Sequence, residues 1–517
     1  MMERFFQSKR GVVVAVALVM ASCLFRLWFV PDARLAGDEA TQYSTAMQVA
    51  DLKLFPVKGV NMTGDAAMTP GGLYHLIMSI PFFFTDDPRG AGVFLVLLNC
   101  ASMLFGWFIL RREFGGVAAT FGLIISLFNP FSVFFSDRQW NPNLLVPLGW
   151  LWIWLLLSAF RGEGRFRWGW LATLLVVSPQ IHMSCPHLTI MTVVMMAVFR
   201  PRIRPLQIAG GTAIGMATYV PYLAVDAYNG WSNTTRILNQ LSEAAAPWYE
   251  AFRGGLYQLL YAGGDYTYFL GKGFWFPMTE WGFLGSGGST AYSTLLGFPS
   301  WPGYPALALL CAALAVAAAA HAFVLLDAVR RGSRGVTAFI RSEPLTVLAI
   351  LNIPVLILLM LKTSKPFYPH YSMVLFPLAI VPVAAAVSRL GRSRTLVAGL
   401  MVLAAAIALN QAILTARYYR AEESKASVHL VVEASRTILA DAGPSSFRLV
   451  FDMPGTRMGT WPFATVARVL HKAEWRERKD GTRLTYVIAP PGSRHEARAA
   501  RIWDIDGKRL IRKEDPK

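Results

Sequence analysis

The sequence predicts a mainly α-helical protein: a polytopic bundle of about 11 transmembrane helices followed by a small C-terminal α/β domain. Three observations predict this class. Of the 517 residues, 54% are hydrophobic and 15% are charged, whereas soluble domains carry about 25% charged residues. Apolar runs long enough for a bilayer recur as far as residue 414. Beyond residue 415 the sequence becomes mixed and charged, which is typical of a domain outside the membrane.

The formal charge of +18 is explained by where the basic residues lie. Arginines gather in short loops after every second apolar run, at 111–112, 161–167, 200–204, 330–341 and 389–394. Short basic loops stay in the cytoplasm. We therefore expect a multi-pass membrane protein with the N-terminus in the cytoplasm and the C-terminus on the opposite side of the membrane. This pattern favours membrane lipids, and not nucleic acid, as the surroundings of the chain.

The predicted spans alternate between these basic loops and the opposite side. The first, Gly11 to Val30, is too long for the apolar core of a signal peptide, and no small-residue cleavage site follows it. The later spans are Ala91–Leu110, Val117–Phe135, Leu144–Phe160, Trp168–Val177, Leu188–Phe199, Leu206–Val225, Tyr304–Leu326, Leu345–Leu361, Ser372–Val387 and Leu396–Leu414.

Two long external loops, 31–90 and 226–303, interrupt the membrane domain, which we place at 1–415. In the first loop, Thr41 to Leu54 has helical spacing, and Leu73 to Phe84 is apolar but short. That length is typical of a helix lying at the membrane interface. Counting Leu73 to Phe84 as a crossing would put every later basic loop outside, which the positive-inside rule rejects.

Residues 416–517 are predicted to form a small α/β domain outside the membrane. A helical stretch, Ser427 to Ala440, precedes two strand-like segments, Phe447 to Phe451 and Leu484 to Ala489. Turn residues separate these elements. The alternative, a disordered basic tail, is disfavoured by this alternation and by tryptophans that need burial.

No cofactor or metal is predicted. The four cysteines are scattered through apolar runs without a CxxC pair, which indicates buried thiols. The sequence contains neither an HExxH motif nor a glycine-rich phosphate loop.

The candidate site is centred on Asp38 and Glu39, which follow the first span by a few residues. Ionisable groups close to hydrocarbon are costly, so they often serve a function; the alternative is a solvated loop that contains two acids. Further polar groups adjoin span ends on the same predicted side and are expected to share one cavity. They are Tyr74, His75, Asp137, Arg138, His182, His187, Lys362, Lys365, His370 and Tyr371.

Carboxylates beside cations at a membrane surface suit a reaction between a lipid-linked anion and a hydroxyl group. A carboxylate would act as general base for the acceptor, and lysine or arginine would hold a phosphate. Each group has a structural alternative. His182 and His187 have two interpretations. They could bind zinc as a pair, or each could be a hydrogen-bonded histidine at a helix end, and their positions favour the second interpretation. Lys362 and Lys365 could instead extend toward water, and Asp137 and Arg138 could form an ion pair.

The order of these pieces resembles the GT-C glycosyltransferases, particularly the branch with the lipid A aminoarabinose transferase and the protein O-mannosyltransferases. The matching pieces are GDEATQY at 37–43, TPGGLYHLI at 69–77, RREFGG at 111–116, FFSDRQWNPNLL at 134–145 and KPFYPHYSMVLFPLA at 365–379. One departure is Pro70-Gly71-Gly72, where the family usually has two prolines. The resemblance covers the first two hundred residues and the late loop.

The resemblance implies an inverting hexosyl- or pentosyltransferase that moves a sugar from a polyprenyl-phosphate donor to an acceptor hydroxyl on the periplasmic face. The acceptor would be a glycan, a lipid or a protein. Asp38 matches the catalytic acid of the family, with Glu39 beside it. Arg138, Lys362, Lys365, His370 and Tyr371 would bind the donor phosphate, and Tyr74, His75, Asp137, His182 and His187 would line the cavity. The alternatives are a lipid or solute transporter and a non-catalytic assembly partner.

Overall fold

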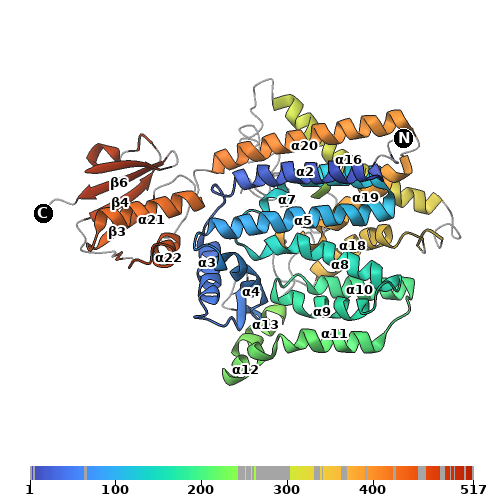
Figure 1. Ribbon diagram of the computed structural model, residues 1–517, viewed down its shortest axis with the longest axis horizontal. Coiled ribbons are helices and arrows are strands. Elements are labelled where there is room, and N and C mark those ends of the chain that lie inside the picture. The colour runs from blue at the N-terminus through green and yellow to red at the C-terminus, as the bar shows by residue number, and fades with distance from the viewer. Residues whose placement is uncertain are drawn as a thin grey trace.

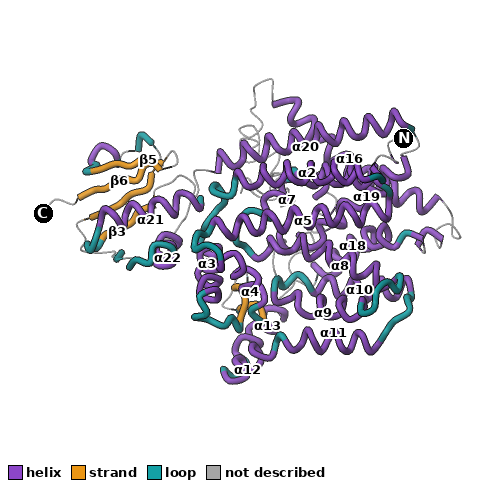
Figure 2. Tube along the Cα trace, viewed as in Figure 1, coloured by secondary structure: helices purple, strands orange, loops and turns teal. Residues whose placement is uncertain are grey.

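The computed structural model describes residues 3–514 apart from 4–5, 63–66, 243–250, 252–254, 256–257, 259–260, 264–302, 331–337, 341, 362–368, 391–392, 423–426, 452–460, 475, 478–483, 490, 494 and 506–507. The described part is mainly helical, with a short hairpin early in the chain and a four-stranded sheet near its end (Figures 1 and 2). The fold class predicted from the sequence is confirmed in this respect. The second external loop, 226–303, lies largely outside the described residues.

The elements of the first half follow the predicted order. They are α2 (Lys9–Trp28), α3 (Gly37–Ala50), β1 (Lys58–Asn61), β2 (Met68–Pro70), α4 (Leu73–Ser79), η1 (Ile80–Phe83), α5 (Arg89–Phe114), α6 (Gly116–Leu127), α7 (Pro130–Phe134), η2 (Asn141–Leu144), α8 (Leu145–Phe160), α9 (Arg167–Val177), η3 (Ser178–Gln180), α10 (Pro186–Phe199), α11 (Pro205–Ala217), α12 (Val220–Tyr228) and α13 (Ser232–Ser242).

The second half contains η4 (Tyr261–Gly263), α16 (Gly303–Arg330), α18 (Pro344–Met360), η5 (Pro369–Leu375), α19 (Phe376–Leu390), α20 (Arg394–Glu422), α21 (Val428–Ala442), β3 (Phe447–Phe451), α22 (Trp461–Val469), β4 (Leu484–Ala489), η6 (Glu496–Arg498), β5 (Arg501–Ile505) and β6 (Lys508–Glu514). Each predicted span coincides with a helix or with two helices in succession. Among the described residues, five helices are long and apolar enough to cross a membrane, and the pair α11–α12 is a sixth if it is one bent span. The count of about 11 therefore stays a prediction.

Prolines explain two interruptions in the predicted spans. Val117 to Phe135 divides into α6 and α7 because Pro130, which lacks an N–H, cannot continue the preceding helix. Asn129 caps α7 by accepting a hydrogen bond from the Phe131 N–H at 3.0 Å. Between α11 and α12 the axis bends by 50°, and Pro221 lies in the first turn of α12. These breaks leave helix-end carbonyls that need partners.

Arg26 supplies such partners inside the bundle. The fully buried guanidinium of this α2 residue donates to the Leu127 carbonyl at 2.7 Å and to the Ser132 carbonyl at 2.8 Å. It also donates to the hydroxyl groups of Ser132 and Ser136. A cation at the carbonyl end of α6 is stabilised by the helix dipole. Arg26 therefore closes the break between α6 and α7 and fixes α2 against it.

Two of the basic loops meet the N-terminal residues at one end of the bundle. Arg111 donates to Gln7 at 3.1 Å, and the Glu3 carboxylate accepts from the Gly116 and Val117 N–H groups at the start of α6. Arg161 pairs with Glu113 at 2.6 Å. These contacts join the N-terminus to two predicted cytoplasmic loops, as the alternation of spans requires. The opposite end carries α3, α4 and the C-terminal sheet (Figure 1).

The C-terminal segment, residues 428–514, forms a sheet with the strand order β3-β4-β6-β5. The predicted helix and the two predicted strands are confirmed as α21, β3 and β4. Strands β3 and β4 pair in parallel, and the other two pairs are antiparallel. The sequence analysis did not predict α22, β5 or β6. Helix α22 packs on α3 of the first loop, which joins this segment to the membrane bundle.

Candidate functional site

A cavity of about 960 Å³ opens at the end of the bundle that carries α3. Its volume is at the upper end of the range for small-molecule sites, about 300–1,000 Å³. The walls come from α3, the β1–β2 hairpin, α4, the corner before α8, the segment before α10, and α18 with η5. The cavity thus joins segments that are separated by more than three hundred residues of sequence, and most of them flank the predicted external loops.

Helix α3 contributes one polar face to the cavity. Asp38, Thr41, Gln42 and Thr45 line it, and their spacing of three, one and three residues places them on one side of an α-helix. Asp38 is exposed and lies in the first turn, where a carboxylate is also favoured by the helix dipole. The predicted catalytic acid therefore faces a cavity large enough for a substrate.

Glu39 has a different environment from its neighbour. Its side chain is 6% exposed, and the carboxylate accepts a hydrogen bond from the Ala36 N–H at 3.1 Å. Burial raises the pKa of Glu39, and the positive charges of Arg34 and Arg138 oppose that rise. The side chain closes the start of α3 in the manner of a capping box. Glu39 lies outside the described lining of the cavity.

Tyr74 and His75 begin α4, but only His75 is part of the cavity lining. The Tyr74 hydroxyl is buried and donates to the Gln42 side chain at 2.5 Å, so Tyr74 fixes a lining residue of α3. Burial lowers the pKa of His75 to about 4, while a hydrogen bond with the Gly59 backbone acts in the opposite direction. His75 is therefore neutral at physiological pH.

His182 and His187 also line the cavity, as predicted. The Nδ1 atom of His182 accepts a hydrogen bond from the Ser184 N–H at 3.1 Å, and burial lowers the pKa of His182 to about 4. His187 Nε2 lies 2.9 Å from Asn352 Oδ1, and Asn352 donates in turn to Gln258 at 3.0 Å. Both histidines are held by polar neighbours, as the helix-end alternative expects.

Asp137 and Arg138 lie beside the cavity but outside its described lining. The Asp137 side chain is 1% exposed; it accepts a hydrogen bond from the Tyr419 hydroxyl of α20 and pairs with Arg138 at 3.3 Å. Burial raises the pKa of Asp137, and the charge of Arg138 opposes that rise. The Arg138 guanidinium stacks over the Phe134 ring at 4.7 Å. Asp137 thus connects the corner before η2 to α20 through Tyr419. Its pairing with Arg138 corresponds to the ion-pair alternative.

Four predicted phosphate-binding residues fall where little can be described. Lys362 and Lys365 lie outside the described residues, and only the backbone of His370 and Tyr371 is described, within η5. The next residue of η5, Ser372, lines the cavity.

Sequence analysis missed Lys58. Among the residues that the structure describes, Lys58 is the only lysine or arginine in the cavity lining. It begins β1 and is half-buried, whereas Lys53 on the preceding turn pairs with Asp51 at 2.7 Å. A signal was present in the sequence, because a lysine on the predicted external side departs from the positive-inside trend. That trend drew attention to Lys362 and Lys365 but not to Lys58.

The cavity lining also includes apolar side chains. They come from α10, α18 and the turn after α3, namely Ile190, Leu356, Leu359, Met360, Leu54 and Phe55. A carboxylate, a lysine and hydroxyl groups therefore share the lining of one cavity with apolar side chains. Such a site can hold an amphipathic molecule with a polar headgroup.

The comparisons with known proteins address the fold. No protein-family model matches the chain, and no curated protein matches it in sequence. Two crystal structures of ArnT from Cupriavidus metallidurans match almost its full length. The structure bound to undecaprenyl phosphate has a TM-score of 0.56 and 10% identity, covering 99% of this chain and 100% of that one. The apo structure has a TM-score of 0.54 and 11% identity, covering 98% of this chain and 100% of that one. ArnT is an aminoarabinose transferase of the GT-C class. The resemblance found in the sequence is therefore confirmed for the fold, because the chain shares the fold of ArnT over almost its full length.

Proposed function

We propose that this protein is a glycosyltransferase that moves a sugar from a polyprenyl-phosphate donor to an acceptor hydroxyl on the periplasmic face of a bacterial inner membrane. The observation that carries the proposal is the cavity whose lining combines Asp38 and Lys58 with apolar side chains of α10 and α18. The fold supports it, because one ArnT structure of the same fold is bound to undecaprenyl phosphate. Residues 1–415 would form the catalytic membrane domain, and residues 416–517 a periplasmic domain.

In the proposed reaction Asp38 is the general base. Its carboxylate accepts the proton of the acceptor hydroxyl while that oxygen attacks the anomeric carbon of the donor. The bond between the anomeric carbon and the phosphate oxygen breaks, and polyprenyl phosphate leaves with the bonding electrons. Attack opposite the leaving group inverts the anomeric configuration. Glu39 supports the start of α3, where its carboxylate is already bonded to the backbone.

Lys58 is the proposed cation for the phosphate. Negative charge increases on the phosphate as the glycosidic bond breaks, and a fixed ammonium group stabilises that charge in the transition state. Lys362 and Lys365 remain proposed as further phosphate ligands, together with His370 and Tyr371. The apolar side chains of α18 and α10 in the lining would contact the first isoprene units of the donor. His75, His182 and His187, uncharged when buried, would border the sugar.

The test is a transfer assay with the purified full-length protein in detergent. Radiolabelled polyprenyl-phosphate sugars are offered one at a time, together with membrane extract as the source of acceptors. The proposal predicts that label from at least one donor moves to a glycan, lipid or protein product. Label that crosses a vesicle membrane while still attached to its lipid would favour the transporter alternative. Full-length protein that binds no donor and transfers none would favour the assembly-partner alternative.

A further inference from the structure

The start of α21 is hydrogen-bonded to the short segment that leads into α3. The Val428 N–H donates to the Ala33 carbonyl at 2.8 Å, and the His429 N–H donates to the Pro31 carbonyl at 3.0 Å. Ser427 and Arg34 form an antiparallel bridge beside them. The first N–H groups of a helix have no partner within that helix. Here two of them hold the backbone a few residues before Asp38.

A second contact holds α3 from its side. Helix α22 packs on α3, and Lys472, just after α22, pairs with Asp86 at 3.1 Å. The backbone carbonyl of Asp86 accepts a hydrogen bond from the Tyr43 hydroxyl of α3 at 2.5 Å. Tyr43 is fully buried and lies off the polar face that lines the cavity. Helix α3 is therefore enclosed between the cavity and the C-terminal segment.

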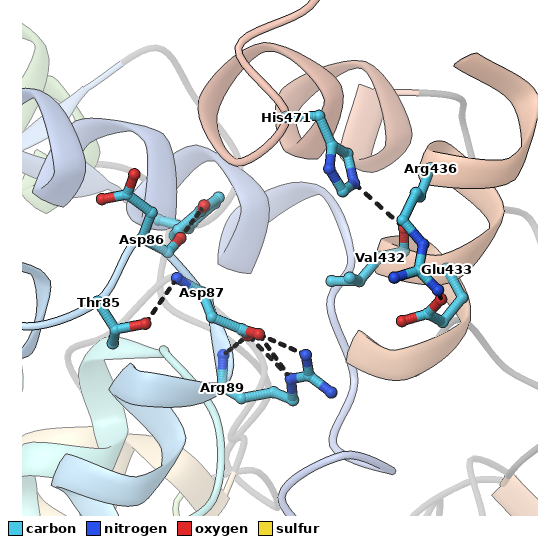
Figure 3. Close-up of polar contacts among 9 residues, drawn as sticks. Thr85, Asp86, Asp87, Arg89, Val432, Glu433, Arg436 and His471 are labelled. Carbon is cyan, nitrogen blue, oxygen red and sulfur yellow. Dashed lines mark hydrogen bonds and ion pairs between the residues drawn. The ribbon is translucent and has the colours of Figure 1, made fainter. Parts of the chain in front are cut away.

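Beyond Asp86, further charged residues lie between the first loop and the C-terminal segment. Figure 3 shows Asp87 and Arg89 on one side, with Glu433, Arg436 and His471 of the C-terminal segment on the other. Asp87 accepts from Arg89 at 2.9 Å, and the charge of Glu433 acts on Arg89 across the gap. His471 in turn contacts the Val432 carbonyl of α21 at 3.4 Å, which joins α22 to α21.

Helix α3 depends on such neighbours for its position. It has 14 residues, including a glycine, two threonines and a serine, which are weak helix formers. A helix of this length is marginal in isolation. Its N-cap position is Ala36, whose methyl side chain offers no hydrogen bond. The capping carboxylate of Glu39 comes from within the helix itself, so it stabilises the first turn without fixing where that turn lies.

We propose that the C-terminal segment is a positioning element of the active site: its α21 amides hold residues 31–34 and its α22 supports α3, so that Asp38 stays against the cavity. This inference rests on the proposed function for its catalytic consequence. The groups that act are the Val428 and His429 N–H groups and Lys472, which lie away from the described lining of the cavity. They act on the reaction through α3.

Val428→Pro tests the proposal. Val428 is the first residue of α21, where proline is tolerated because the N–H it removes has no use within the helix. Ser427 before it has φ −69° and ψ 156°, a conformation that suits a residue preceding proline. The variant therefore removes the hydrogen bond to Ala33 while leaving α21 able to form. Val428→Ala is the matched control, since it loses more of the side chain but keeps the N–H.

We expect Val428→Pro to lower kcat about three- to tenfold relative to Val428→Ala, the range that corresponds to one hydrogen bond. KM for the donor should be the same in both, because Lys58 and the apolar lining are untouched. Hydrogen exchange of the amides in residues 37–43 should be faster in Val428→Pro. Equal kcat and equal exchange in the two variants would overturn the proposal.

A charge exchange gives an independent test if Val428→Pro does not fold. The single variants Lys472→Asp and Asp86→Lys each break the ion pair between these two residues. The double variant restores the pair with its charges reversed. Exposed pairs are weak, so we expect about a twofold loss of kcat in each single variant and recovery in the double. A double variant worse than both singles would contradict the proposed contact. Hydrogen exchange of the amides in residues 37–43 can be measured even if the wild-type protein transfers no sugar. This measurement therefore separates the inference from the proposed function.

Discussion

Two adjacent carboxylates at the start of α3 have opposite environments. Asp38 faces the cavity and is exposed, whereas Glu39 is buried and bonded to the backbone of Ala36. An exposed carboxylate in the cavity lining can be reached by an acceptor hydroxyl group. A buried carboxylate bonded to an N–H group supports the helix instead. Successive side chains of an α-helix point about 100° apart around its axis, so Asp38 and Glu39 face different surroundings.

Lys58→Ala should weaken donor use. Removing the cation takes away a charge that attracts the donor phosphate and stabilises the leaving group, so KM for the donor should rise and kcat should fall, together by about 10²-fold in kcat/KM. The measurement is donor-dependent kinetics in the transfer assay. Lys53→Ala is the matched control because Lys53 is exposed and paired with Asp51. Equal donor kinetics in the two variants would remove Lys58 from the phosphate site.

At the residue scale, the structure places four of the predicted side chains in the cavity lining, while the roles predicted for them stay predictions. Asp38, His75, His182 and His187 were expected in the cavity and line it. Sequence reasoning was less informative for Arg138, because proximity in sequence to the end of a span does not show which way a side chain points. Arg138 is instead engaged by Asp137 and by the Phe134 ring. Lys58 was missed because its strand has only four residues and no distinctive pattern.

At the element scale, the β1–β2 hairpin and α4 form one wall of the site. His75 of α4 and Gly59 of β1 both belong to this wall, and the Gly59 backbone opposes the lowering of the His75 pKa by burial. Close packing leaves no room for a side chain at Gly59, since a Cβ there would lie 2.0 Å from the Thr69 hydroxyl and 2.9 Å from the Gly71 carbonyl. This wall is therefore tightly packed, and its buried imidazole makes it sensitive to acid.

Acid should destabilise this wall through His75. The folded protein keeps the pKa of His75 near 4, below the ordinary value of 6.5. The unfolded chain therefore binds a proton first as pH falls, and the free energy of unfolding decreases between pH 6.5 and pH 4. At pH 5 the loss from one such histidine is about 2 kcal/mol. His75→Gln should show a smaller drop in Tm between pH 7 and pH 5 than the wild type in the same detergent. An equal drop in both proteins would show that His75 does not contribute.

The elements themselves were largely predictable. Apolar runs bounded by arginines located most of the described bundle helices to within about four residues, because hydropathy and charge determine such helices directly. Helix α20 is the exception, since it continues to Glu422, past the predicted end at Leu414. The breaks at Pro130 and Pro221 were not placed, although proline chemistry accounts for both. In the C-terminal segment β5 and β6 were missed, since their many charged residues mask the alternation of a sheet with one exposed face.

At the scale of the whole molecule, the loops that carry Arg111 and Arg161 lie at the end of the bundle where the chain begins, and α3, which lines the cavity, lies at the opposite end (Figure 1). A membrane between these ends would place the cavity on the side opposite the arginines. Since short basic loops stay in the cytoplasm, the cavity and the C-terminal segment would lie in the periplasm. The proposed function requires this orientation, because it would give the site access to lipid-linked donors and to acceptors of the cell envelope.

Fusion of a reporter that is active only in the periplasm tests this orientation. Placed after Lys517, the reporter should be active; placed in the basic loop after Arg112, it should be inactive. The second fusion is the control for reporter expression, and both are quantified by immunoblotting. A stable but inactive fusion after Lys517 would mean that the number of crossings is even, with Leu73 to Phe84 as the first segment to reassign.

The central claim is that Asp38 acts as the base of a sugar transfer, and one comparison tests it most directly. Asp38→Asn keeps the size of the side chain and removes its basicity, while Asp51→Asn makes the same change at the exposed far end of α3. Product formation from the accepted polyprenyl-phosphate sugar is measured for both purified variants at matched protein concentration. The account predicts a loss of about 10²–10⁴-fold in kcat for Asp38→Asn and wild-type rates for Asp51→Asn. Full transfer by Asp38→Asn at normal expression would contradict the account.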